Sequence, residues 1–148
     1  MIIAVGCDHA GYELKLELIR HLQQRGLETV DFGTDSTSSC DYPDYARKVA
    51  QAVVDGNAQL GLLVCGTGIG MSIAANKVKG IRAAVLSDEF SAQATREHND
   101  ANILCLGARV VDVPTAVRLL DIFLDTPFSH GENHVRRIGK IAELEKEA

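Results

Sequence analysis

Residues 60–70 read Leu60-Gly61-Leu62-Leu63-Val64-Cys65-Gly66-Thr67-Gly68-Ile69-Gly70, and no other stretch of the chain indicates the fold so clearly. The first six of these residues are nearly all apolar, which is typical of a parallel strand covered on both faces. The glycines that follow lead into a segment, 69–77, with a helical pattern. A buried strand, a glycine turn and a helix in this order indicate an α/β protein.

Outward from this stretch, apolar runs alternate with segments of helical periodicity along the whole chain. The predicted strands are 2–6, 27–32, 60–65, 82–86 and 103–106, and the predicted helices are 11–25, 43–55, 69–77, 88–97, 114–124 and a charged helix from about 134. Gly26 and Asp112 are candidate helix caps. The repeats predict one α/β domain over residues 1–148, with a single-domain three-layer α/β/α, Rossmann-like fold and a five-stranded parallel sheet.

Composition excludes several classes of partner. The 148 residues are enough for one hydrophobic core, and the formal net charge of -5 without a basic run argues against nucleic acid. No apolar stretch is long enough to span a membrane. The N-terminal residues have neither the basic start nor the long apolar run of a signal peptide, so we expect a cytoplasmic protein. In so acidic a chain, an anionic ligand needs a local cationic pocket.

The four cysteines, Cys7, Cys40, Cys65 and Cys105, form no C-x-x-C pair. This spacing argues against a zinc ribbon and against a thioredoxin-like site, and a reducing compartment keeps such thiols free. Three of them lie at or near the ends of apolar runs, where a small buried hydrophobic residue is the default interpretation.

Ligands of parallel sheets bind beyond the carboxyl ends of the strands. The residues that follow the predicted strands are therefore the candidates for a site: Cys7-Asp8-His9, Gly33-Thr34, Cys65 to Gly70, Ser87-Asp88 and Gly107-Ala108-Arg109.

The loop 66–70 can gather backbone N–H groups around a negative charge, either a phosphate or an oxyanion formed during a reaction. A simple strand-to-helix turn is the alternative. A dinucleotide site is a weaker interpretation, because the spacing is G-x-G-x-G and the loop follows the third strand rather than the first.

Several side chains near this edge could carry chemistry. Cys65 precedes the glycine loop, where N–H groups favour a thiolate that could act as a nucleophile, a base or a redox sensor. His9 follows the first strand, and His98 lies in a polar segment that we interpret as a turn. His130 and His134 have the i, i+4 spacing of a zinc pair, but no third ligand is evident, so we predict no metal. Arginines 109, 136 and 137 are candidate phosphate ligands, although paired arginines often only face solvent.

Six motifs in order resemble the type B ribose-5-phosphate isomerases and their relatives, the allose-6-phosphate and galactose-6-phosphate isomerases. They are Gly6-Cys7-Asp8-His9-Ala10-Gly11, Asp41-Tyr42-Pro43-Asp44-Tyr45, Cys65-Gly66-Thr67-Gly68-Ile69-Gly70, Ala74-Ala75-Asn76-Lys77, Gly80-Ile81-Arg82-Ala83 and Glu97-His98-Asn99-Asp100-Ala101-Asn102.

The resemblance implies an aldose–ketose isomerase that interconverts ribose 5-phosphate and ribulose 5-phosphate without metal or cofactor. It implies catalytic roles for Cys65 as the base, for His98 in ring opening and for Thr67. It also implies contacts to the sugar from Asp8, Tyr42 and Asn99, an oxyanion site at Gly66, Gly68, Ile69 and Gly70, and a phosphate site at His9, Arg109 and Arg137. The resemblance further implies a homodimer or a dimer of dimers with shared sites, in which a C-terminal helical segment at about 131–148 contacts a neighbouring subunit.

Two positions bear on this assignment. Some members of the family use a glutamate as the base, but Met71 occupies the corresponding position here and cannot take a proton. Members commonly carry an arginine where this chain has Asn133, so one expected phosphate charge is missing. A six-carbon sugar phosphate as substrate, a non-enzymatic phosphate- or nucleotide-binding module and a cysteine redox sensor therefore stay open as alternatives.

Overall fold

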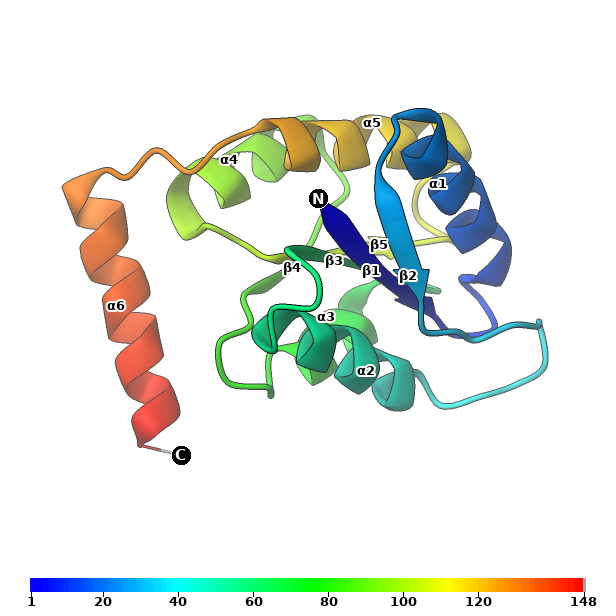
Figure 1. Ribbon diagram of the computed structural model, residues 1–148, viewed down its shortest axis with the longest axis horizontal. Coiled ribbons are helices and arrows are strands. Elements are labelled where there is room, and N and C mark those ends of the chain that lie inside the picture. Colours follow the sequence, from blue (N-terminus) through cyan, green and yellow to red (C-terminus); the bar gives the residue numbers. More distant parts are fainter. Residues whose placement is uncertain (148) are drawn as a thin grey trace.

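The computed structural model describes residues 1–147 and contains one sheet of five parallel strands, in the order β2-β1-β3-β5-β4 (Figure 1). The strands are β1 (Ile2–Cys7), β2 (Glu28–Asp31), β3 (Leu60–Cys65), β4 (Ala83–Val85) and β5 (Ile103–Gly107). The predicted five-stranded parallel sheet is confirmed.

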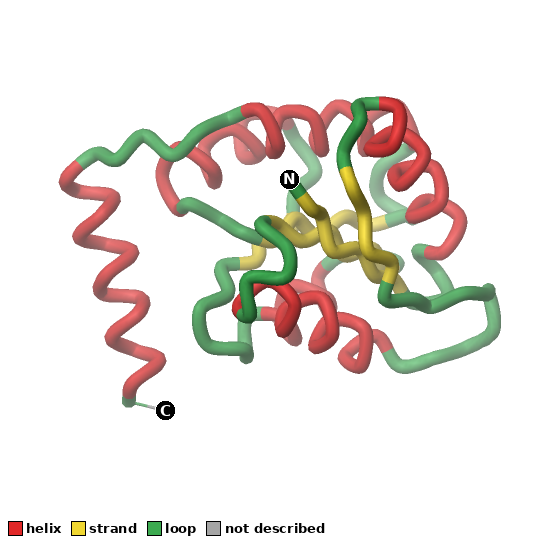
Figure 2. The backbone as a smooth tube through the Cα atoms, in the orientation of Figure 1, coloured by secondary structure: helices red, strands yellow, loops and turns green. Residues whose placement is uncertain are grey.

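Helices cover both faces of the sheet (Figure 2). One face carries α1 (Tyr12–Gln24), α4 (Glu89–Asn99) and α5 (Val113–Asp125), and the other carries α2 (Tyr42–Val54) and α3 (Ile69–Ala75). The last helix, α6 (Glu132–Lys146), belongs to neither layer. The arrangement confirms the predicted three-layer α/β/α fold.

Strand β3 lies at the centre of the sheet, and all six of its residues are buried. Its side chains alternate between the two layers, as in any strand. Leu62 and Val64 pack into the core beneath α1 and α5, whereas Leu63 and Cys65 pack into the core beneath α2 and α3. The thiol of Cys65 therefore lies on the α2/α3 side, at the carboxyl end of the central strand.

The predicted caps are confirmed. The Asp112 carboxylate accepts a hydrogen bond from the Thr115 N–H at 2.9 Å at the start of α5. Gly26 follows α1 with a φ of +76°, a left-handed conformation that glycine adopts without steric cost.

The prediction of a turn around His98 is wrong. Helix α4 continues to Asn99 and places His98 in its last turn, and Asp100 ends the helix with a φ of +46°. The polar residues at the end of α4 gave no helical signal, because that side of the helix is exposed and carries no apolar stripe. Helix α6 begins at Glu132, within the predicted helical segment at about 131–148 and two residues before the predicted start of the charged helix, so Arg136 and Arg137 lie in its second turn. Residue 148, the end of the predicted domain, lies outside the described residues.

Helix α6 stands apart from the three layers (Figure 1). No residue of it is buried, and Val135, Ile141 and Leu144 are 51%, 43% and 63% exposed. One contact to the body is the Glu145 carboxylate, which accepts a hydrogen bond from the Gly80 N–H at 3.0 Å. Among the helices of residues 1–147, none has both the length and the apolar character that a membrane span requires.

Candidate functional site

The ends of β1, β3 and β5 meet at the carboxyl edge of the sheet. The Asp8 N–H donates to the Val64 carbonyl at 3.2 Å, and the Ala108 N–H donates to the Cys65 carbonyl at 2.9 Å. The Arg109 N–H donates in turn to the Gly66 carbonyl at 3.0 Å. These bonds place Asp8, the Cys65 loop and Arg109 side by side. We call the predicted site residues at this edge the carboxyl-edge group: Asp8, His9, Tyr42, Cys65, Gly66, Thr67, Gly68, Ile69, Gly70 and Arg109.

The glycine loop folds back onto the Cys65 thiol. The Gly68 N–H donates to the sulfur at 3.1 Å, and Cys65 as a residue is 5% exposed. The Ile69 N–H donates to the Thr67 hydroxyl at 3.2 Å. Within residues 1–147, the N–H groups of Thr67 and Gly70 have no hydrogen-bond acceptor, so both remain available to a bound oxyanion.

Two glycines of the loop allow neighbouring side chains to approach closely. A methyl group on Gly70 would lie 2.7 Å from the Tyr42 ring, and one on Gly66 would lie 3.3 Å from Nη1 of Arg109. The structure thus brings Tyr42, at the start of α2, and Arg109, after β5, against the loop that follows Cys65.

Gly68 has a φ of +80°, and a methyl group there would lie 2.9 Å from the Leu106 carbonyl carbon. Gly26 matches it in backbone conformation, with a φ of +76°, but has nothing within 4 Å. We expect Gly26→Ala to lower the free energy of unfolding by about 1–2 kcal/mol, the cost of the left-handed conformation alone. Gly68→Ala should lower it by roughly 3 kcal/mol or more, because the loop must also move away from β5. Urea denaturation of the two variants measures the difference, and equal losses would show that the approach to Leu106 is unimportant.

Asp8 and His9 are both held in place by backbone groups. One carboxylate oxygen of the buried Asp8 accepts from the Ala10 and Gly11 N–H groups, at 3.0 and 3.1 Å, and so fixes the turn into α1. Nδ1 of His9 accepts from the Cys40 N–H at 3.3 Å, which leaves the ring proton on Nε2. A neutral His9 can therefore donate from Nε2 to an anion.

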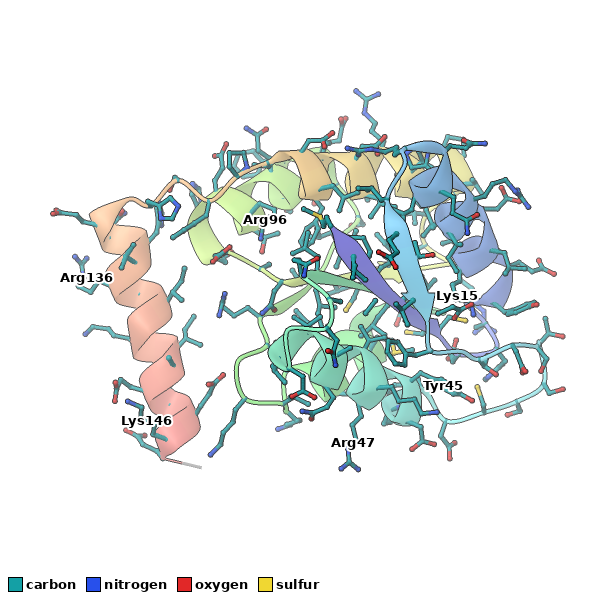
Figure 3. All side chains as sticks on the ribbon, in the orientation of Figure 1. Lys15, Tyr45, Arg47, Arg96, Arg136 and Lys146 are labelled. Atoms are coloured by element: carbon teal, nitrogen blue, oxygen red, sulfur yellow. The ribbon has the colours of Figure 1, made fainter. Side chains whose placement is uncertain are left out.

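A buried lysine that is not among the predicted site residues supports this edge. Lys15 belongs to α1, is 1% exposed and lies beside β2 (Figure 3). Its ammonium group donates to Asp31 at 2.9 Å and to the Thr34 carbonyl at 2.6 Å. Lys15 thereby anchors the segment between β2 and α2. Its position three residues before Leu18, in line with an apolar stripe, was the available signal, since a charge at such a position must find a buried partner.

Cys7 and Cys105 are completely buried. Burial raises the pKa of Cys7 to about 11 despite the nearby Lys15 ammonium. Burial also raises the pKa of Cys105, and the adjacent Cys65 contributes to the increase. Both groups therefore stay protonated thiols at neutral pH. This agrees with the prediction that they are small buried hydrophobic residues. All four cysteines are free.

The remaining predicted site residues lie at the opposite edge of the sheet. Arg82 directly precedes β4, and its side chain donates to the Asn99 carbonyl at 3.0 Å, which places the end of α4 at the amino edge. The His98 ring stacks on the His134 ring of α6, with centroids 4.4 Å apart and planes 13° from parallel. We call His98, Asn99, His134 and Arg137 the amino-edge group.

The two groups cannot meet within one chain. A strand rises about 3.3 Å per residue, so six-residue β3 separates the two edges by roughly 20 Å. His98 and Cys65 therefore face different surroundings in the same subunit.

The surroundings of His130 and His134 do not favour a zinc pair. His130 lies outside α6 with a φ of +59° and packs against Phe128, whereas His134 is stacked on His98. Partial desolvation lowers the pKa of His134, and the charges of His98 and Arg137 lower it further. Within residues 1–147, no three His, Cys, Asp or Glu side chains are grouped as ligands for a metal ion.

Comparison with known proteins gives one consistent result. The family model described as Ribose/Galactose Isomerase matches residues 3–141. Ribose-5-phosphate isomerase B of Escherichia coli (strain K12) is 48% identical over 144 residues, which are 97% of this chain and 96% of that protein. The structure of Clostridium thermocellum ribose-5-phosphate isomerase B is 52% identical with a TM-score of 0.98 and covers 99% of both chains. The Mycoplasma genitalium enzyme with bound ribulose-5-phosphate is 41% identical, has a TM-score of 0.93 and covers 99% of this chain and 97% of its own.

Proposed function

Because the chain belongs to the Ribose/Galactose Isomerase family, we propose that it is an aldose–ketose isomerase that interconverts ribose 5-phosphate and ribulose 5-phosphate. The observation that carries this proposal is the end-to-end similarity to ribose-5-phosphate isomerases B, at 48% and 52% identity. The ribulose-5-phosphate bound to the Mycoplasma genitalium relative supports a pentose phosphate as the substrate.

Cys65 is the proton-transfer base in this proposal. Its thiolate takes the proton from C2 of the open-chain aldose and returns it to C1. The hydroxyl at C2 loses a proton to become the ketone oxygen, and the oxygen at C1 gains one to become a hydroxyl. The Gly68 N–H donates to the sulfur at 3.1 Å, which fixes the sulfur beside the backbone N–H groups of the loop. Met71, fully buried on the next helix, cannot substitute as a base.

The glycine loop stabilises the intermediate. Proton removal leaves an enediolate, and preorganised N–H donors stabilise the negative charge on its oxygen. The free N–H groups of Thr67 and Gly70 are the donors that the folded loop offers. Thr67 in the loop, with Asp8 and Tyr42 beside it, contacts the sugar. His9 and Arg109 bind the phosphate from the same edge.

The proposed site requires two subunits. Ring opening needs an acid/base near neutrality, the role proposed for His98, but His98 lies at the opposite edge of the sheet from Cys65. A second copy of the chain that places its amino-edge group against the carboxyl-edge group supplies His98, Asn99 and Arg137 to the site. We therefore propose a homodimer, or a dimer of dimers, with shared sites.

The exposed apolar residues of α6 support this assembly. Val135, Ile141 and Leu144 are exposed, and no residue of α6 is buried within its own chain. Arg136 points away from the body of the chain (Figure 3). A groove of about 470 Å³ separates α6 from the body, with Ile141 and Leu144 on one wall and Ile81 and Ala83 on the other. A partner subunit that covers α6 would bury this apolar surface.

The preferred sugar can be tested by steady-state kinetics on ribose 5-phosphate, allose 6-phosphate and galactose 6-phosphate side by side. We expect the highest kcat/KM with ribose 5-phosphate. A higher kcat/KM with a hexose phosphate would show that the chain is a hexose-phosphate isomerase of the same family. Turnover of none of the three, with retained binding of phosphate ligands, would favour a non-enzymatic binding module.

Asn133 provides a second test of substrate identity. It is the second residue of α6 and is exposed, so an arginine fits there without repacking. We expect Asn133→Arg to lower the KM for ribose 5-phosphate about tenfold, because hydrogen bonds to charged partners contribute about 1.5–3 kcal/mol. The kcat should change little, since a phosphate contact is nearly uniform between ground and transition states. A raised KM would instead identify Asn133 as a specificity residue for a different sugar phosphate.

A further inference from the structure

The stacked pair His98–His134 joins the ends of two helices. His98 lies in the last turn of α4 and His134 in the first turn of α6. Ser129 reinforces this junction, because its N–H and its hydroxyl both donate to the Glu97 carbonyl, at 3.2 and 2.8 Å. The connection between α5 and α6 is thus fixed at the residue preceding His98, and the two imidazole rings lie face to face.

The position of His98 makes stacking by the His134 ring chemically important. The His98 side chain is exposed and comes from a helix end, so little else in the chain restricts its ring. A group that moves a proton must present one nitrogen to the reacting oxygen within hydrogen-bond reach, and small misplacements of such groups are costly. An imidazole 4.4 Å away and nearly parallel removes the free rotation of the His98 ring plane.

The charge state of the supporting ring suits this arrangement. Desolvation lowers the pKa of His134, and His98 and Arg137 lower it further, so His134 stays neutral near pH 7. Two stacked imidazolium ions would repel each other, whereas a neutral ring can stay stacked on His98 in either of its protonation states.

We propose that His134 is a positioning residue that holds the His98 imidazole, by stacking against it, in the orientation that opens the furanose ring. This inference rests on the proposed function and extends it to a residue outside the predicted site. His134 itself transfers no proton, so an uncharged aromatic side chain at this position should stack on His98 equally well.

The two directions of the reaction distinguish this role from a structural one. Ribose 5-phosphate is mainly a furanose and must open before isomerisation. Ribulose 5-phosphate is open-chain, because its C5 oxygen carries the phosphate and cannot close a furanose ring. In the reverse direction the open-chain aldose can leave the enzyme and close its ring in solution, so a defect in enzymatic ring opening slows the aldose-to-ketose direction selectively. A general loss of structure slows both directions.

The experiment measures initial rates in both directions for the wild type, His98→Ala, His134→Ala and His134→Phe. We expect His134→Ala to lower kcat/KM for ribose 5-phosphate about tenfold and to change the rate with ribulose 5-phosphate less than about twofold, in the same sense as His98→Ala. His134→Phe should retain most of the wild-type rate. His130→Asn, which removes a nearby imidazole outside α6, is the matched control and should have no effect.

Each other outcome overturns the inference. Equal losses in both directions would make His134 merely structural, and no loss would make the stack irrelevant. Wild-type rates in His134→Ala but not in His134→Phe would show that the ring does not support His98. A His98→Ala variant without a directional effect would also remove the basis of the inference. Failure of the proposed function is separate, because the wild type would then show no isomerisation in either direction.

Discussion

Replacement of Cys65 by alanine is expected to abolish isomerisation in both directions, with kcat lowered by about 10²–10⁴, the usual contribution of a general base. The loss should be in chemistry and not in folding, because the substitution removes one sulfur atom at the end of β3 and leaves the backbone hydrogen bonds of that edge in place. Steady-state kinetics, together with binding of a sugar phosphate to the variant, measures the two effects separately.

Cys105 offers a matched control. It lies on the neighbouring strand in the same core as Cys65, it is fully buried, and its raised pKa keeps it a neutral thiol. Cys105→Ala should therefore lower the free energy of unfolding while retaining near-normal kcat.

Alkylation of Cys65 in the wild type should be slower when a sugar phosphate is bound. A Cys65→Ala variant with near-normal kcat would exclude Cys65 from the mechanism.

Mixing two inactive variants is expected to restore activity when their substitutions lie at opposite edges of the sheet. Cys65→Ala damages the carboxyl-edge group, and His98→Ala damages the amino-edge group. A hybrid dimer of the two contains one site with both substitutions and one site with neither. Random exchange at equal concentrations makes half of the dimers hybrids, so the mixture should reach about a quarter of the wild-type activity with ribose 5-phosphate.

The control pairs two substitutions at the same edge. Cys65→Ala and Arg109→Ala both alter the carboxyl-edge group, so no hybrid of these subunits contains an intact site and no activity should return. Subunit exchange is verified independently with a fluorescent label. Exchange without recovery in the first mixture, or equal recovery in both mixtures, would contradict shared sites.

Much of the fold follows from the local sequence pattern. Strand β3 begins and ends where its apolar run does, because a central strand is buried on both faces and the glycines end it sharply. The cap at Asp112 and the turn at Gly26 were predicted for the same reason, since each depends on a local preference of the backbone. The carboxyl-edge group, apart from Tyr42, could also be predicted, because residues that follow parallel strands share one edge.

The rest depends on contacts between distant segments. The sequence around His98 does not indicate a helix, because a polar helix end carries no apolar periodicity. His98 and His134 are 36 residues apart in the sequence, and only the fold brings their rings together. The separation of His98 from Cys65 follows from topology, because a helix after a parallel strand returns to the amino edge. The burial of Lys15 depends on Asp31 and Thr34, which a helical pattern alone does not reveal.

The most direct test of the account is a proton NMR measurement of the wild-type protein with ribose 5-phosphate in D₂O, in the presence of excess chelator and without added cofactor. We expect ribulose 5-phosphate signals to appear and part of the product to carry solvent deuterium at C1. The chelator should not change the rate, since Cys65 and the glycine loop are proposed to suffice for proton transfer. Absence of any ketose signal from a folded protein that still binds the sugar phosphate would contradict the account.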